Sequence, residues 1–308
     1  MKLKNIALYS VLTLLIWSCK DDDDVNSRTF PLQTLSQTAL ENEAEIQRFL
    51  QTHFYELDGN NIVFDTIAGA NTSKTPLSQV VSSTVISITP KERGLLDKDN
   101  TAVDHTLYYL VAKEGPDSNP YATIADSTYM RYEGLRLDGT VFDARTGEPV
   151  WFDLLGNPFL RTGRAVIGFA EGIAKFRPGG AITENGDGTF NVENPSIGFI
   201  IIPSGLGYFA GAVPGKTYAP MIFKLDIIRS INADHDNDGV TSIQEGVSSI
   251  NSNLDQDTDD DNISDYLDTD DDGDTILTRD EIKVDSEGNF ISFLYTDEDD
   301  IPDHLDAK

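Results

Sequence analysis

Acidic residues recur at regular intervals near the C-terminal end of the chain, and the first group has the clearest spacing. Counted from residue 234, carboxylates stand at positions 1, 3, 5 and 12, in Asp234, Asp236, Asp238 and Glu245. Together with the backbone carbonyl of Val240 at position 7, carboxylates at this spacing can enclose a calcium ion, which takes about six to eight oxygen ligands. Gly239 at position 6 permits the sharp turn that such a loop needs. The spacing therefore predicts a structural calcium site.

Similar spacing recurs three more times. The second group places carboxylates at Asp257, Asp259, Asp261 and Asp268. Its turn residue is Asn262, a residue type that tolerates a left-handed backbone. The third group has Asp270, Asp272, Asp274 and Glu281. Thr275 at its turn fits less well. The fourth group offers Asp297, Asp299, Asp303 and Asp306. Tyr295 occupies its first ligand position.

The four groups follow the EF-hand loop pattern, but they nearly abut and no helices flank them, so the tail resembles thrombospondin type 3 repeats. A disordered acidic tail is the alternative, because high charge and few apolar residues oppose folding. Against it, an aliphatic residue follows the turn in every group, at Val240, Ile263, Ile276 and Ile301. Packed carboxylates repel one another without a cation. We expect a tail that folds only with Ca²⁺ and that the rest of the chain does not need.

A second set of candidate residues lies in four blocks in the middle of the chain. The first block, T-Y-M-R-Y-E-G-L-R-L-D-G-T-V-F-D-A from Thr128, predicts a strand, a tight L-D-G turn and a second strand. The others are V-I-G-F-A-E-G-I from Val166, I-P-S-G-L-G-Y from Ile202 and Y-A-P-M-I-F-K-L-D-I from Tyr218. Each block alone is a weak signal, since such short strings occur by chance. Four blocks in a fixed order are specific.

In these blocks the chain resembles the FKBP family of peptidyl-prolyl cis-trans isomerases. The resemblance implies an α+β fold in which a twisted antiparallel β-sheet wraps on a short helix. It also implies an aromatic cup lined by Tyr132, Phe142, Phe169 and Phe223, with Val150 or Phe152 on one wall. By the same resemblance, the backbone N–H of Val166 and the hydroxyl of Tyr208 bind substrate carbonyls. Asp143 would polarise the pocket and orient Tyr132.

The reaction implied by this resemblance is rotation about an Xaa-Pro bond, which has a barrier of about 18–20 kcal/mol. At the twisted transition state the amide has lost its resonance and part of its dipole. An apolar cavity therefore favours the twisted amide over the planar one. Because the reaction needs no nucleophile, metal or acid–base pair, no cofactor is expected for catalysis. FK506-type ligands are expected to bind the same pocket.

Two positions depart from the family pattern. Val150 stands where the family often has Phe, so this wall should be shallower, and Phe169 stands where it often has Trp. Read singly, the aromatic residues are also typical of a packed β-sheet core. A non-catalytic binding module with this fold is therefore the alternative function. Residues 183–196 contain N-G-D-G and predict an inserted hairpin that extends the sheet away from the pocket.

The negative charge of the chain is unevenly distributed. The 308 residues have a formal net charge of −29. Residues 232–308 contain 25 acidic and 3 basic residues, a net charge of −22, and residues 1–231 have a net charge of only −7. No basic face is visible that could neutralise phosphates, so nucleic-acid binding is not expected.

The N-terminal segment has the features of a lipoprotein signal peptide at residues 1–18. Basic residues at the start precede an apolar run from Ile6 to Trp17, which is short for a membrane span. The run ends at L-I-W-S-C, which resembles a bacterial lipobox in which Cys19, the single cysteine, is lipidated. An uncleaved membrane anchor is the alternative. A single cysteine excludes an internal disulfide.

An acidic tether follows Cys19 in residues 19–33, beginning with Lys20 and four aspartates. A solvated spacer explains this run physically. The run also resembles the signal after the lipidated cysteine in surface-exposed lipoproteins of Bacteroidota. A thioether-linked diacylglycerol and an amide-linked acyl chain on Cys19 would suffice for stable anchoring. We expect a lipid-anchored protein of the cell envelope, in the outer membrane, on either its periplasmic or its exposed face.

The sequence pattern predicts the structure of residues 34–103 less clearly than that of the other segments. Apolar residues at helical spacing from Thr38 predict a helix that ends by Asp58-Gly59. Two alternating segments, from Ile62 and from Val80, predict strands. We expect an N-terminal extension, an isomerase domain at residues 104–231 that opens with the strand from Thr106, and the calcium-binding tail at residues 232–308. The predicted protein is an exported isomerase whose partners are proline-containing polypeptides.

Overall fold

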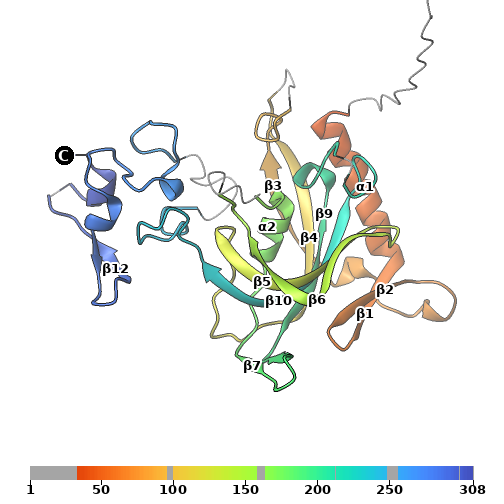
Figure 1. Cartoon of the computed structure of the whole chain (residues 1–308). Coiled ribbons are helices and arrows are strands. Elements are labelled where there is room, and N and C mark those ends of the chain that lie inside the picture. Colours follow the sequence, from red (N-terminus) through yellow and green to blue (C-terminus); the bar gives the residue numbers. More distant parts are fainter. Residues whose placement is uncertain are drawn as a thin grey trace, which may run out of the picture. The chain divides into compact units, whose positions relative to one another are not determined.

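The computed structural model describes residues 33–95, 100–157, 164–211, 213–247, 256–297 and 299–307 (Figure 1). The chain divides into two compact units, residues 1–32 and residues 33–308, and all described residues belong to the second. The predicted signal peptide, Cys19 and all but the last residue of the acidic tether lie outside the described residues. Within the described ranges, no helix is long and apolar enough to cross a membrane.

A six-stranded antiparallel sheet in the order β3-β4-β9-β10-β5-β6 forms the centre of the second unit. Its strands are β3 Ser82–Ile88, β4 Val103–Lys113, β5 Asp126–Arg136, β6 Val141–Asp153, β9 Ser196–Ile202 and β10 Met221–Asn232. The prediction of an antiparallel sheet is confirmed. Strand β4 was predicted to be the first strand of the sheet. Strand β3 precedes it in the chain and pairs with it at the edge of the sheet, so β4 is the second strand.

The central strand β9 is buried along its whole length, and its side chains alternate between two apolar layers. On one face, Phe199 and its neighbours two residues away pack against helix α1 (Leu35–Thr52) and strand β2 (Asn61–Thr66). On the other face, Ile200 and Ile202 pack against the short helix α2 (Ile167–Ile173). The expected packing of a sheet on a short helix is therefore present, and α1 and β2 cover the opposite face.

Helix α1 ends earlier than its sequence predicts. Thr34 caps its start, because the side-chain oxygen accepts a hydrogen bond from the Gln37 N–H at 3.2 Å. The predicted end at Asp58-Gly59 is wrong, because the helix stops at Thr52 and the chain continues as strand β1 (His53–Asp58). β1 pairs with β2, and Gly59 adopts a φ of +63° in the turn between them.

The hairpin predicted in residues 183–196 is present as β7 (Ile182–Glu184) and β8 (Phe190–Val192). It forms a two-stranded sheet of its own and does not extend the six-stranded sheet, so that part of the prediction is wrong (Figure 1). The physical reason is length: each strand has only three residues, and all of their pairing is with each other.

The acidic tail consists of loops, short 3₁₀ turns and one hairpin that was not predicted. The hairpin joins β11 (Ile282–Val284) to β12 (Phe290–Phe293). In the described part of the chain the 3₁₀ turns are η1 Gly69–Asn71, η2 Leu77–Gln79, η3 Ser204–Leu206, η4 Asp265–Leu267, η5 Thr278–Asp280 and η6 Asp303–Leu305.

The first acidic loop, residues 234–245, packs against the main core. Val247, just after the loop, is fully buried in the same apolar cluster as Phe169 and Phe223. The His235 side chain lies 3.1 Å from Asp153 at the end of β6, and Asn157 donates to the His235 carbonyl at 2.9 Å. We expected a tail that the rest of the chain does not need, but the first loop of the tail contacts the core.

Candidate functional site

Five aromatic rings predicted to line a cup come together beside the sheet. They come from β5, β6, α2 and β10, in Tyr132, Phe142, Phe152, Phe169 and Phe223. The centroids of Phe169 and Phe223 lie 4.9 Å apart, and those of Phe142 and Phe223 lie 5.6 Å apart. The Phe152 centroid lies 5.4 Å from those of both Tyr132 and Phe169. Most of these pairs meet edge to face, the geometry that aromatic quadrupoles favour.

The cup has a buried floor and a more exposed rim. Tyr132, Phe169 and Phe223 are 4–6% exposed and form the floor. The other predicted pocket residues are partly buried at its edge: Phe142, Val150, Phe152, Val166 and Tyr208. Both candidate wall residues are therefore present, since Phe152 contacts two of the rings and Val150 packs against the same cluster.

A glycine that the sequence analysis did not single out makes room for two of these rings. A Cβ atom at Gly134 would lie 2.8 Å from both Phe142 Cζ and Phe223 Cε1. Gly134 lies in β5, and Phe223 is its partner across the sheet in β10. Glycine inside a strand pattern often marks such a close approach, so the Y-E-G-L string contained a signal for this role.

Asp143 lies close to both predicted hydroxyl groups. The Tyr132 hydroxyl donates a hydrogen bond to Asp143 Oδ2 at 2.7 Å. Burial, followed by this carboxylate, raises the pKa of Tyr132 to about 12. Burial, and then Asp143, also raises the pKa of Tyr208. Both phenols are therefore neutral near pH 7. No described residue accepts a hydrogen bond from the Tyr208 hydroxyl, which leaves this donor for a ligand.

Val166 lies immediately before α2, with an extended backbone at φ −63° and ψ 145°. In the described ranges, its backbone N–H has no hydrogen-bond acceptor. The first N–H groups of a helix lack intrahelical partners, so this end of α2 has donors to offer. The predicted amide donor and the Tyr208 hydroxyl thus both lie at the rim of the aromatic cup, where an amide carbonyl would need them.

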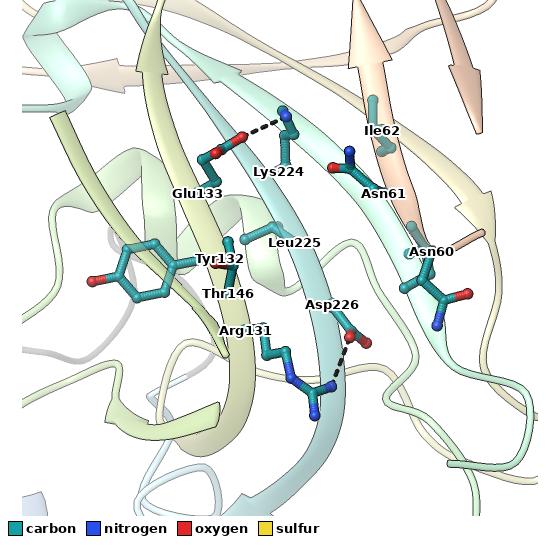
Figure 2. A pocket seen from close by; sticks show the side chains of 11 residues that line it. Asn60, Asn61, Ile62, Arg131, Tyr132, Glu133, Thr146, Lys224, Leu225 and Asp226 are labelled. Atoms are coloured by element: carbon teal, nitrogen blue, oxygen red, sulfur yellow. Dashed lines mark hydrogen bonds and ion pairs between the residues drawn. The ribbon is translucent and has the colours of Figure 1, made fainter. Parts of the chain in front are cut away.

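A cleft of about 410 Å³ that contains two ion pairs lies on the opposite face of the same strands (Figure 2). Arg131 pairs with Asp226 at 3.1 Å, and Lys224 pairs with Glu133. The Tyr132 ring points away from these pairs in Figure 2. Alternation along β5 and β10 explains the difference, because successive side chains point to opposite faces. The sequence did not predict this cleft, because its lining joins β5 and β10 to the β1–β2 turn, and no local pattern shows that these segments meet.

The four acidic segments of the tail share one loop geometry. In each, the carboxylate at position 5 accepts a hydrogen bond from the backbone N–H at position 7, at 2.7–2.9 Å. The turn residue at position 6 has a positive φ in every loop, in Gly239, Asn262, Thr275 and Asp300. Thr275 adopts +82° although such a φ is unfavourable for a β-branched residue. The repeat expected from the sequence is therefore present in the backbone, including its poorest member.

Carboxylate oxygens gather in each loop, but not with the full predicted membership. Within each group the potential ligand atoms lie within 4.8 Å of one another, and three groups belong to single loops: Asp257, Asp259 and Asp261; Asp270, Asp272 and Asp274; Asp297, Asp299 and Asp306. The first loop supplies Asp236, Asp238 and Glu245 to a fourth group, which also includes Asp271 from the third loop. In the described part of the chain, four predicted ligands lie outside these groups: Asp234, Asp268, Glu281 and Asp303.

Asp234 has a structural use instead. Its two oxygens accept hydrogen bonds from the backbone N–H groups of Asn237 and Gly239, at 2.7 and 3.1 Å. Two histidines of the tail contribute to its packing: the His235 ring lies 2.7 Å from the Ser242 hydroxyl, and the His304 ring stacks on Phe293. Asp271 was missed because it occupies position 2 of its own loop, which the repeat pattern does not use for a ligand.

Comparisons with known proteins found matches only at low similarity. No protein-family model matches the sequence, and no curated protein matches it. A solved peptidyl-prolyl cis-trans isomerase from Pseudomonas syringae pv. tomato is 21% identical, with a TM-score of 0.30, over 40% of this chain and 74% of that chain. FkpA from Escherichia coli is 18% identical, with a TM-score of 0.35, over 63% of this chain and 61% of that chain.

A multi-domain immunophilin from Arabidopsis thaliana is also similar, at 13% identity and a TM-score of 0.33, over 53% of this chain and 52% of that chain. The match therefore spans less than two thirds of the length of both FkpA and the immunophilin.

Proposed function

We propose that this protein is an FKBP-type peptidyl-prolyl cis-trans isomerase that acts on Xaa-Pro bonds of exported and envelope proteins. The observation that supports this best is the arrangement of hydroxyl groups on the aromatic cup. Tyr132 is held by Asp143 at 2.7 Å over a floor of buried rings, and Tyr208 lies at the rim without a described partner. Four separate sequence blocks had to fold together to build it.

The arrangement suits a reaction that rotates a bond without breaking one. The planar Xaa-Pro amide has a large dipole and is well solvated by water, whereas the twisted amide has lost part of that dipole. A floor of aromatic rings therefore disfavours the planar form more than the twisted form. The Tyr208 hydroxyl and the Val166 N–H would hold the carbonyls that flank the proline, and Asp143 would fix the Tyr132 ring at the edge of the floor.

The test is catalysis of cis–trans exchange in a series of Xaa-Pro peptides, with and without an FK506-type inhibitor. Removing one hydrogen-bond donor costs about 1–3 kcal/mol, so Tyr208→Phe should lower kcat/KM by about ten- to a hundredfold. Tyr129→Phe is the matched control, because Tyr129 lies in the same strand as Tyr132 but stacks on Trp151. A wild-type protein that accelerates exchange in no peptide would overturn the proposal.

A non-catalytic binding module is the second candidate, and the burial of the floor favours it. Tyr132, Phe169 and Phe223 are 4–6% exposed and pack on one another, as core residues do. Peptide binding that shifts the NMR signals of the rim residues without accelerating exchange would establish this alternative.

We also propose that the tail binds Ca²⁺ as a structural ion. Buried carboxylate oxygens without a hydrogen-bond partner support this, because they fit a hard cation that takes oxygen ligands; in the described residues they include atoms of Asp238, Glu245, Asp272 and Glu281. Burial, and then its neighbouring carboxylates, raises the pKa of Glu245 to about 11. Bound calcium would relieve both the burial cost and the repulsion.

Anchoring of the protein in the outer membrane through lipidated Cys19 is a further proposal, supported by the sequence alone. Mass spectrometry of protein from membranes should find an acylated Cys19 peptide and no residues 1–18. An intact Met1 terminus in the membrane fraction would overturn it in favour of an uncleaved anchor.

A further inference from the structure

The most unusual feature of the tail is an acidic group made by two different loops. Asp236, Asp238 and Glu245 come from the first loop, and Asp271 comes from the third. One oxygen of each lies within 4.8 Å of the others. The sequence neighbours of Asp271, Asp270 and Asp272, belong to the separate group of the third loop. Asp271 therefore points away from its own loop's group and joins another.

The group is buried and its charge is not balanced. Asp238 and Asp271 are 2% exposed, and Glu245 is 7% exposed. Both carboxylate oxygens of Asp271 and both of Glu245 are buried without a hydrogen-bond partner in the described part of the chain, as is one of Asp238. No described lysine or arginine forms an ion pair with this group. Burying unpaired carboxylates is very costly, and a cation would remove that cost.

We propose that Asp271 is a ligand of the calcium ion bound by the first loop, so that one ion joins the first and third loops. This inference rests on the proposed binding of Ca²⁺ by the tail. Four carboxylates from two segments provide the oxygen-only environment that Ca²⁺ prefers, with the irregular geometry that it tolerates better than Mg²⁺. Asp271 thereby joins a group to which the predicted ligand Asp234 does not belong.

The shared ion connects the tail to the core. The first loop is held to the end of β6 by the contact of His235 with Asp153 at 3.1 Å, and Val247 is buried among the residues of the main apolar cluster. An ion that joins Asp271 to this loop therefore ties the third loop to a segment that the core already holds. Losing the ion should free more of the tail than one loop.

Calcium titration of the full chain tests the shared site, with three single variants compared by isothermal titration calorimetry. Asp271→Asn and Glu245→Gln should each weaken the same site by about tenfold or more, and the double variant should weaken it further. Asp260→Asn is the matched control, because Asp260 is exposed, lies outside every group and has a φ of +61° that Asn tolerates. It should bind like the wild type.

Thermal unfolding separates a ligand from a structural residue. In chelator, Asp271→Asn should be at least as stable as the wild type, because it removes one charge from a repulsive group. With calcium it should be less stable. If Asp271→Asn binds calcium like Asp260→Asn while Glu245→Gln loses the site, the shared site is overturned and calcium binding stands. A wild-type chain that binds no calcium would overturn both proposals.

A second, independent observation concerns Asn42 in α1, which is 2% exposed. Its Oδ1 accepts a hydrogen bond from the Ser204 N–H at 2.6 Å, and its Nδ2 donates to the Tyr218 carbonyl at 2.8 Å. Ser204 and Tyr218 lie at the two ends of the segment that contains Tyr208. Arg93 adds a bond to the Gly205 carbonyl at 2.8 Å. One side chain thus joins both ends of the Tyr208 segment to the N-terminal helix.

We infer that Asn42 is a positioning residue for Tyr208, an inference that rests on the proposed isomerase activity. Asn42→Ala should lower kcat/KM by about tenfold in the wild-type background and by much less in a Tyr208→Phe background, because its effect acts through that hydroxyl. Gln47→Ala is the control, since Gln47 in the same helix bonds Tyr108 instead. Equal losses in both backgrounds would overturn the inference, and a wild type without activity would overturn the isomerase proposal itself.

Discussion

The aromatic site and the first acidic loop differ in whether their polar groups have hydrogen-bond partners. In the aromatic site, Tyr132 donates to Asp143, and the Asp143 side chain is 46% exposed to solvent. In the acidic loop, Asp238 and Glu245 are buried and have oxygens without partners in the described part of the chain. The first site is complete with the groups that the polypeptide supplies. No described lysine or arginine pairs with the second site, so the calcium ion proposed above would have to balance its charge.

Calcium removal should give the largest difference between the two regions. At a free calcium concentration about 100-fold above Kd, each bound ion stabilises the folded tail by about 2.7 kcal/mol. Chelation should therefore abolish the protection of residues 256–307 in hydrogen exchange and limited proteolysis, while the six-stranded sheet stays protected. Equal protection of the tail with and without chelator would contradict metal-dependent folding.

A methyl group added to the floor of the aromatic site should have the next largest effect. Gly134→Ala places a carbon 2.8 Å from the rings of both Phe142 and Phe223, and such overpacking costs about 1–3 kcal/mol. We expect lower thermal stability and a lower kcat/KM, with no change in calcium affinity. Gly147→Ala in β6 is the control, because nothing lies within 4 Å of its added carbon and its φ is not positive. Identical behaviour of the two variants would contradict the ring packing.

The Val247→Ala variant tests whether the six-stranded sheet depends on the acidic tail for its stability. Val247→Ala removes two methyl groups from the main apolar cluster, at about 0.8 kcal/mol each, and should lower the stability of the sheet by about 2 kcal/mol. Val284→Ala, at a position 43% exposed, should change stability little. Chemical denaturation in saturating calcium measures both. A sheet unaffected by Val247→Ala would show that the tail is dispensable, as the sequence alone suggested.

The pH dependence of activity should show the smallest effect. Burial raises the pKa of Tyr132 to about 12 and also raises that of Tyr208. In the unfolded chain a tyrosine loses its proton near pH 10. The folded state favours the neutral phenols, so this contribution to the free energy of unfolding is fully present below pH 10 and is lost as the pH rises toward 12. We therefore expect kcat/KM to stay constant from about pH 6 to 9 in an exchange assay. A decline centred below pH 9 would contradict neutral tyrosines as the working form.

Much of the local structure was readable in the sequence. The L-D-G turn joins β5 to β6, and the alternating segments before residue 90 form β2 and β3. All four acidic segments form loops, and the three predicted turn residues Gly239, Asn262 and Thr275 have a positive φ. These features depend on local rules of turn chemistry and side-chain alternation. The end of α1 was misjudged because Asp58-Gly59 serves equally well as a helix end or as a hairpin turn, and pairing with β2 decides between them.

The sequence by itself determined which residues could line an aromatic cup and which could bind a cation. Residue type and spacing decide which side chains a turn or one face of a strand carries. Only the tertiary structure decided which of them meet. Asp271 joins the first loop rather than its own, Asn42 reaches both ends of the Tyr208 segment, and Gly134 makes room for two rings. These contacts join residues far apart in the chain, and local spacing contains no information about such distances. They depend on how the elements pack, since packing brings distant segments within hydrogen-bonding and van der Waals range.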